Sequence, residues 1–509
     1  MILIKTLHLT RSQPGEARKR LILGPGLLAS GTALIVLWQN ARLTVLWDLS
    51  YVLENATRIA GGDLPYRDFP FPYAPLTFLL QALIIRLFGH SLWHHIAWSA
   101  IAGAASTALA YGIIRKITGS ETLAFLFSLP LIPLGIYSIF PHPFYDPDCC
   151  LAILGITALF LRDEDSIALG ALAVVPLFIK QNIGLPFLAA FIVVAILRRR
   201  WRTLSGSAIA SAAALMLVTV VFGIGNYLHW TIEFAAQRRL PPISRQVEPY
   251  LDPILWVWIA CVLCGYLVRR YSRAAGISIL ALPWLWIAWR FFAADDPLEP
   301  QINLLRTWPL IVVLALPLLR RPLVFLLLAA IQGALLSQSI WGSTYGIWPL
   351  LFILAAVLFN KLSIDKRALV LASIIAGVTL LGATRYIVLE ERLKYAKIFE
   401  DWRPGLASLV AWTDQNIPRE DGILSLPGED LFYFTTGRRP RVPVVMFDRT
   451  INPYDAKTIA QFPVKWLIVK KRLQLNGTPM ENEDEVLRLL APRLSPAAHL
   501  PNYDVYRVR

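Results

Sequence analysis

Long apolar blocks recur along the chain from residue 21 to residue 388, and short polar segments rich in Lys and Arg separate them. Most blocks approach the roughly 20 apolar residues that an α-helix needs to cross the hydrocarbon core of a bilayer. A helix suits that environment because lipid offers no hydrogen-bond partners, so the backbone must satisfy its own polar groups. The pattern therefore predicts an α-helical polytopic membrane protein.

The basic clusters orient these blocks, because cytoplasmic loops are enriched in Lys and Arg. The spans predicted between the clusters are residues 21–38, 92–114, 121–140, 147–161, 166–179, 183–197, 204–225, 252–268, 274–292, 304–319, 322–340, 345–360 and 368–388. The block 73–88 is short and contains Arg86, so we expect it to lie in the membrane interface. About thirteen spans with an inner amino terminus place the carboxyl terminus outside.

Composition agrees with this interpretation. Of 509 residues, 56% are hydrophobic and only 16% are charged, which is too apolar for a set of soluble domains. The net charge of +15 is spread over the short loops and forms no basic domain, so it indicates topology and no nucleic-acid partner. The four cysteines lie in or beside apolar blocks, where they are expected to pack as small hydrophobic residues.

The composition changes near Glu390 to mixed polar sequence. Strand-like runs at 423–426, 466–469 and 504–508, with a short amphipathic helix at 483–490, predict a small α/β domain. We therefore divide the chain into a transmembrane domain, residues 1–389, and an extracytoplasmic domain, residues 390–509. The outer loop 39–91 is expected to carry interfacial helices.

Several ionisable residues fall at the outer end of the predicted spans. Asp48 lies in the first outer loop, Asp146 and Asp148 begin the fourth span, and Lys180 lies at the top of the fifth. Arg238 and Arg245 lie in a later outer loop. Ionisable groups at membrane depth are costly and mark functional sites. Carboxylates beside cations suit a reaction in which a hydroxyl loses a proton while an anionic phosphate departs.

The outer loops also resemble those of a known family. Trp47-Asp48, then Gly-Gly-Asp-Leu-Pro-Tyr-Arg-Asp-Phe at 61–69 and Tyr-Ala-Pro-Leu at 73–76, is similar to the first outer loop of the GT-C membrane glycosyltransferases. The most similar branch holds the bacterial aminoarabinose transferase of lipid A and related lipopolysaccharide-core and protein-mannosyl enzymes. The likeness continues in Tyr145-Asp146-Pro147, Lys180-Gln181-Asn182, Gln237-Arg238 and Ser343-Thr344-Tyr345.

This resemblance implies a polyprenyl-phosphate-sugar donor and inversion at the anomeric carbon. By matching positions, Asp48 is the catalytic carboxylate and Asp146 the second acidic residue. The residues expected near the donor phosphate or sugar are Lys180, Arg238, Tyr345, Arg67, Tyr66 and Arg245. The chain departs from the branch at Leu49, where the family has Glu, and at Ala74, where it has Lys. Arg67 is a candidate to replace that missing lysine.

Structural alternatives remain open for these residues. Asp48 and Asp146 could serve as helix starts, and Lys180 could extend to the interface. No cofactor is certain, although Asp146 could help hold a divalent cation. A lipid-linked sugar transporter, or a polymerase or ligase using diphosphate-linked glycans, remains an alternative function. The leading hypothesis is a transferase of the bacterial plasma membrane acting on an envelope lipid, glycan or protein acceptor.

Overall fold

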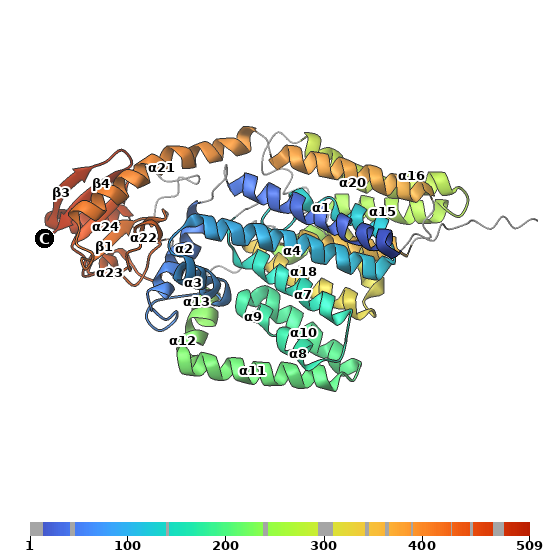
Figure 1. Cartoon of the computed structure of the whole chain (residues 1–509), viewed down its shortest axis with the longest axis horizontal. Coiled ribbons are helices and arrows are strands. Elements are labelled where there is room, and N and C mark those ends of the chain that lie inside the picture. Colours follow the sequence, from blue (N-terminus) through green and yellow to red (C-terminus); the bar gives the residue numbers. More distant parts are fainter. Residues whose placement is uncertain are drawn as a thin grey trace, which may run out of the picture.

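A computed structural model describes most of the chain. The described residues are 14–40, 46–138, 142–237, 243–293, 309–341, 346–361, 366–387, 390–428, 430–447, 451–471 and 483–509. A bundle of long helices forms the larger part, and a small domain containing a β-sheet lies at one end of it (Figure 1). The long helix α21, Glu390–Asn416, leads from the bundle into that domain.

Helices occupy the segments that the apolar blocks predicted. They are α1 Pro14–Asn40, α4 Leu92–Thr118, α5 Glu121–Ser128, α6 Leu131–Leu134, α7 Tyr145–Phe160, α8 Ile167–Leu172, α9 Val175–Ile179, α10 Gln181–Leu197, α11 Trp201–Val221, α15 Pro253–Val268, α16 Arg273–Ala293, α18 Pro322–Trp341, α19 Trp348–Phe359 and α20 Lys366–Ile387. The described part of the 304–319 block is also helical, from residue 309 into the 3-10 turn Leu316–Leu318. The predicted polytopic helical fold is confirmed.

The lengths of these helices vary widely. Within the described ranges, three are long and apolar enough to cross a bilayer by themselves: Leu92–Thr118, Trp201–Val221 and Ala368–Arg385. Two predicted spans are each divided into two helices. The 121–140 block breaks near Pro130, and the 166–179 block breaks just before Pro176. Proline lacks the N–H that continues a helix, which accounts for both breaks.

Small and polar residues hold neighbouring helices together. The hydroxyls of Thr32 in α1 and Thr107 in α4 lie 2.9 Å apart. The Ser207 hydroxyl in α11 donates to the carbonyl of Gly170 in α8 at 2.9 Å, and a Cβ at Gly170 would overlap the backbone of α11. Such close contacts and interhelical hydrogen bonds are typical of helices that associate in lipid, where hydrophobicity gives little attraction between them.

Two helices and a loop cover one end of the bundle. Helix α2 spans Leu46–Ala60 and helix α3 spans Leu76–Phe88. The 13 residues of α3 reach only about 20 Å, short of the roughly 30 Å hydrocarbon core. Arg86 explains the interruption of this block, because its guanidinium donates to the carbonyls of Ala60 and Ile59 at 3.0 and 3.2 Å. It thereby caps the end of α2.

The carboxy-terminal domain contains a four-stranded sheet in the order β1-β2-β4-β3. Its elements are β1 Ile423–Leu426, α22 Phe432–Thr436, α23 Ala456–Ala460, β2 Trp466–Lys470, α24 Glu483–Leu490, β3 Leu494–His499 and β4 Tyr503–Val508. Strand β2 pairs in parallel with β1 and antiparallel with β4. Strand β3 was not predicted, because it contains Pro496 and few apolar residues, and it lies at the sheet edge where proline is tolerated.

Candidate active site

Three of the sequence-predicted residues lie at helix ends. Asp48 is in the first turn of α2, so it lies inside the helix and does not precede it as a cap. Asp146 is in the first turn of α7. Lys180 lies at the break between α9 and α10, where its extended backbone, with φ −151°, separates the two helices. The break directs the lysine side chain toward α7.

Lys180 and Asp146 form a buried ion pair. The Lys180 Nζ lies 3.5 Å from Oδ2 of Asp146, and the two side chains are only 9% and 4% exposed. Buried charges need a partner because leaving water is costly for each of them. The buried position favours a role inside the protein over the alternative in which Lys180 extends to the interface. The pair therefore holds an ammonium group in a fixed place under the first outer loop.

Two stacked tyrosines complete the surroundings of this lysine. The ring centroid of Tyr145 is 3.9 Å from the Lys180 Nζ, and the Tyr73 centroid is 5.7 Å from it. The two rings stack with centroids 4.9 Å apart. Aromatic faces attract cations, and more strongly when water is excluded. Both Asp48 and Asp146 interact electrostatically with Tyr145.

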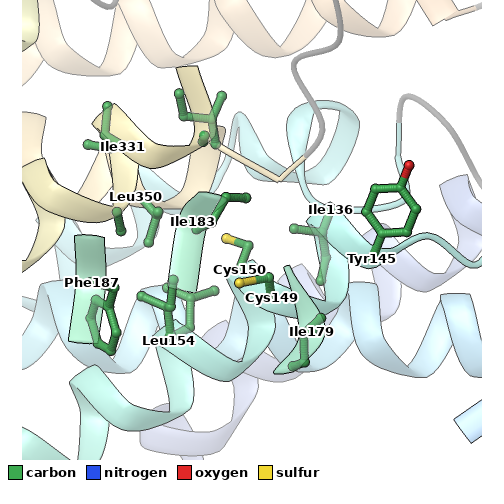
Figure 2. Packing of buried hydrophobic residues seen from close by; sticks show 14 of the residues in the cluster. Ile136, Tyr145, Cys149, Cys150, Leu154, Ile179, Ile183, Phe187, Ile331 and Leu350 are labelled. Carbon is green, nitrogen blue, oxygen red and sulfur yellow. The ribbon is translucent and has the colours of Figure 1, made fainter. Parts of the chain in front are cut away.

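The rest of α7 anchors this arrangement in the apolar core. Figure 2 shows Cys149 and Cys150 among apolar side chains, including Ile183, and shows Tyr145 at the edge of that cluster with its hydroxyl directed away. Both cysteines are buried and free, as their positions in the sequence predicted. The polar groups of the site thus lie at the boundary of a large apolar cluster.

Asp148, the second acidic residue at the start of the fourth predicted span, accepts hydrogen bonds from three donors. The hydroxyls of Tyr137 and Thr77 donate to it at 2.6 and 2.8 Å, and the Trp98 indole N–H donates at 3.3 Å. Tyr137 adopts a left-handed φ of 63°, which is rare for a bulky residue and holds its hydroxyl toward α7. The three donors are consistent with a structural role for Asp148 in fixing α7. The functional role of Asp146 stays a prediction.

The remaining predicted residues lie around the first loop or outside the described ranges. Tyr66 is buried in left-handed backbone, with φ 67°, and its hydroxyl donates to the Tyr73 carbonyl at 2.6 Å. Arg67 is exposed, with its Nε 4.0 Å from Asp68. Arg245 lies in α14, Ile243–Leu251, where only the backbone is described. Arg238 and Tyr345 fall outside the described residues. All of these remain predictions as donor contacts.

The loop around Tyr66 is built from aromatic side chains. Its ring contacts Phe71, and it also contacts Phe222 and Tyr227 at the end of α11 and in α12, Ile224–Leu228. The segment continues through the π-helical turn His229–Glu233 into α13, Phe234–Gln237, which ends just before Arg238. These contacts hold the first outer loop against the loop that carries the predicted arginines.

Sequence reasoning missed Tyr73 as part of the site. Its signal was present, because Tyr73 opens the Tyr-Ala-Pro-Leu run at 73–76 in a loop dense with aromatic residues. Within the described ranges, no group of three or more His, Cys, Asp or Glu side chains is placed to hold a metal ion. The Lys180 ammonium lies next to Asp146, the residue suggested for a divalent cation, and that suggestion stays a prediction.

No protein-family model matches the sequence, and no curated protein matches it. The structure is similar to that of ArnT from Cupriavidus metallidurans bound to undecaprenyl phosphate, with a TM-score of 0.57 and 14% identity, covering 96% of this chain and 98% of the other. The apo state of the same protein matches with a TM-score of 0.52 and 14% identity, over 97% and 98% of the two chains.

An oligosaccharyltransferase from Archaeoglobus fulgidus, in complex with zinc and sulfate, is a weaker likeness. Its TM-score is 0.48 at 12% identity, over 87% of this chain and 68% of that one. The two ArnT matches cover nearly the whole chain, including the carboxy-terminal domain. They establish the GT-C type membrane fold that the outer-loop resemblance implied.

Proposed function

We propose that this chain is a membrane glycosyltransferase that moves one monosaccharide from a polyprenyl-phosphate carrier to an acceptor hydroxyl or amine on the outer face of the bacterial plasma membrane. The observation that carries the proposal is the buried ammonium of Lys180, held by Asp146 and Tyr145. The fold supports it, because ArnT has been crystallised with undecaprenyl phosphate in the same architecture.

In the proposed reaction, Asp48 accepts the proton of the acceptor hydroxyl. The oxygen then attacks the anomeric carbon from the face opposite the phosphate, and a new glycosidic bond forms. The bond from the anomeric carbon to the phosphate oxygen breaks, and its electron pair leaves with the polyprenyl phosphate. A single displacement of this kind inverts the anomeric carbon. General-base assistance contributes about 10²–10⁴-fold in rate.

Lys180 has the electrostatic role in this mechanism. Negative charge grows on the departing phosphate oxygen, and a positive charge already fixed in a water-poor site stabilises it without reorganising. Asp146 and the Tyr145 ring hold the ammonium in place before the donor arrives. Arg238, which follows α13, is the second cation that we assign to the phosphate.

The proposed sidedness follows from the basic clusters. Glu164, Arg198 and Arg200, which form ion pairs at 2.8 and 2.9 Å, lie in the loops that we assign to the cytoplasm. Asp48, Asp146 and the carboxy-terminal domain belong to the opposite, outer side in this assignment. The lipid carrier would lie in the bilayer with its phosphate at the level of Lys180.

The test is a transfer assay with the reconstituted full chain. The donor is the polyprenyl-phosphate-sugar pool of a native envelope lipid extract, and mass spectrometry identifies the product. Asp48→Asn should abolish transfer without loss of the fold, while Asp163→Asn, the same change at an exposed cytoplasmic carboxylate, should leave it unchanged. A well-folded and fully active Asp48→Asn variant would refute the proposal. Transfer from diphosphate-linked carriers alone would favour a ligase or polymerase.

A further inference from the structure

One face of helix α2 carries polar side chains that are almost fully buried. Ser50, Glu54 and Arg58 are 0%, 1% and 5% exposed, and they recur every four residues. This spacing places them on one stripe of the helix. Buried polar groups are costly unless they find partners, so the partners of this stripe indicate what α2 is built to bind. The partners of Ser50 and Glu54 lie in the carboxy-terminal domain.

Glu54 forms the central contact. The backbone N–H groups of Tyr433 and Phe434 donate to its two carboxylate oxygens at 2.9 and 3.1 Å. Both donors belong to α22 of the carboxy-terminal domain. One turn earlier, the Ser50 hydroxyl donates to the carbonyl of Gly428 at 3.4 Å. The polar stripe of α2 is therefore hydrogen-bonded to two segments that follow strand β1.

Asp63 forms a second anchor beyond the end of α2. Its carboxylate accepts from the Arg58 guanidinium at 2.8 Å, and it also pairs with Arg439 of the carboxy-terminal domain. Arg58 is itself held over the Phe69 ring, with the guanidinium carbon 4.6 Å from the centroid. The stripe and the turn after it are thus joined to the carboxy-terminal domain by one hydrogen-bonded and ionic chain.

Apolar contacts support the same interface. Leu431, Phe434 and Met446 of the carboxy-terminal domain are buried in the apolar cluster of the membrane domain. The rest of that domain packs in two clusters of its own, around Leu467 and Ile468. The domain therefore has a separate core and adds a small set of residues to the core beneath α2.

The polar stripe and Asp48 lie on different faces of α2. Glu54 and Asp48 are six residues apart, which places them about 120° apart around the helix axis. Tyr51, on an intermediate face, contacts the Tyr73 and Phe78 rings. The helix is thus held from one side by the aromatic loop and α3 and from another by the carboxy-terminal domain. These contacts fix its rotation, and the rotation decides where Asp48 points.

We propose that the carboxy-terminal domain is a positioning element for the reaction, and that Glu54 is the positioning residue through which it sets the orientation of α2 and Asp48. This inference rests on the proposed function of Asp48. A displacement of about 1 Å in a catalytic group can lower the rate by about 100-fold. Loosening the Glu54 contacts should therefore slow the chemical step, with little effect on donor binding at Lys180.

The first experiment compares kcat and the donor KM of reconstituted variants. Glu54→Ala should lower kcat by about 10- to 100-fold with the donor KM changed by less than about 3-fold. Glu54→Gln, which keeps one acceptor oxygen, should recover part of kcat. Arg439→Ala, which removes a half-exposed side chain, should lower kcat by a smaller factor. The matched control is Glu485→Ala, the same charge change at a half-exposed residue of α24.

A second experiment restores the contact covalently. A Cβ built at Gly61 lies 3.5 Å from the Arg439 side chain, so Gly61→Cys with Arg439→Cys should form a disulfide between the two domains. In the Glu54→Ala background, the oxidised pair should regain most of kcat and the reduced pair should not. A purely structural effect on global stability would raise the melting temperature on oxidation without this recovery.

The outcomes separate the two proposals. Folded Glu54→Ala protein with wild-type kcat would overturn the positioning inference, and so would a fully oxidised disulfide that leaves the Glu54→Ala variant slow. If Glu54→Ala does not fold, Arg439→Ala decides, and an unchanged kcat overturns the inference. An inactive Asp48→Asn variant in the same series keeps the proposed function intact. A fully active one refutes the proposed function itself.

Discussion

Replacing Lys180 by Met tests the electrostatic centre of the site. The substitution keeps most of the side-chain volume and removes the ammonium that lies 3.5 Å from Asp146. Two unit charges at that distance interact by about 5 kcal/mol at an effective dielectric constant of about 20. Measured losses for one partner of a buried pair are about 3–5 kcal/mol, because the other charge stays buried alone. Lys180→Met should therefore destabilise the fold by several kcal/mol.

The same substitution should have a separate effect on catalysis. Loss of one preorganised group that stabilises developing charge typically lowers kcat by about 10²–10³-fold. The double variant Lys180→Met with Asp146→Asn removes both charges and leaves no buried ion. Its stability should return to within about 1–2 kcal/mol of the wild type, since replacing a whole buried pair is often close to neutral. Its kcat should remain low, because the phosphate still lacks its cation.

The assay combines thermal unfolding of the reconstituted chain with transfer kinetics at saturating donor. Recovery of stability without recovery of kcat supports a direct role for Lys180 at the phosphate. Recovery of both in the double variant would refute it, because the lysine would then serve only to neutralise Asp146. A Lys180→Met variant as stable as the wild type at neutral pH would contradict the buried ion pair itself.

Three further predictions address neighbouring groups. Asp148→Asn should lower stability by about 1–3 kcal/mol, because three donors lose their anionic acceptor, while kcat at saturation stays within about 3-fold of the wild type. Tyr66→Phe should cost about 0.5–1.5 kcal/mol through its lost bond to Tyr73, and an increased donor KM would instead indicate sugar contact. Burial, with Asp430 nearby, raises the pKa of Glu54 well above its ordinary value of 4.5. The state in which Glu54 contacts α22 therefore binds more protons than the state in which the contact is broken. The contact should be strongest near and below pH 4.5 and weaken as pH rises through the raised pKa of Glu54. Hydrogen exchange of the Tyr433 amide, corrected for intrinsic rate, should report this trend, and Glu54→Gln should flatten it.

The sequence predicted the helical segments of the membrane domain because each bilayer span must be a continuous apolar run that satisfies its own backbone. The same rule does not reveal where a span is interrupted. The break at Lys180 joins two apolar runs, and only the tertiary contact with Asp146 distinguishes it from an ordinary interruption. Strand β3 was not predicted because its residues show little alternation of apolar and polar side chains. Its extended structure depends on its pairing with β4.

Asp48, Asp146 and Lys180 could be predicted because charged residues near apolar spans are few and conspicuous. Glu54 and Asp63 could not. In the sequence they are ordinary polar residues of an outer loop, and their burial depends on a domain that begins more than 300 positions later. Tyr73 was hidden in a similar way, because its ring gains importance only when it stacks on Tyr145.

The contact between Glu54 and α22 can form only late in the synthesis of the chain. The two partners are separated by 379 positions, the larger part of the chain. At a synthesis rate of about 5–20 residues per second, α22 follows α2 by about 20–80 seconds. During that interval the first outer loop has no partner for its buried carboxylate. In the proposed enzyme, a truncated or unfinished copy would carry Asp48 on a helix without its positioning contacts, and glycosyl transfer would reach its full rate only in chains that have been completed.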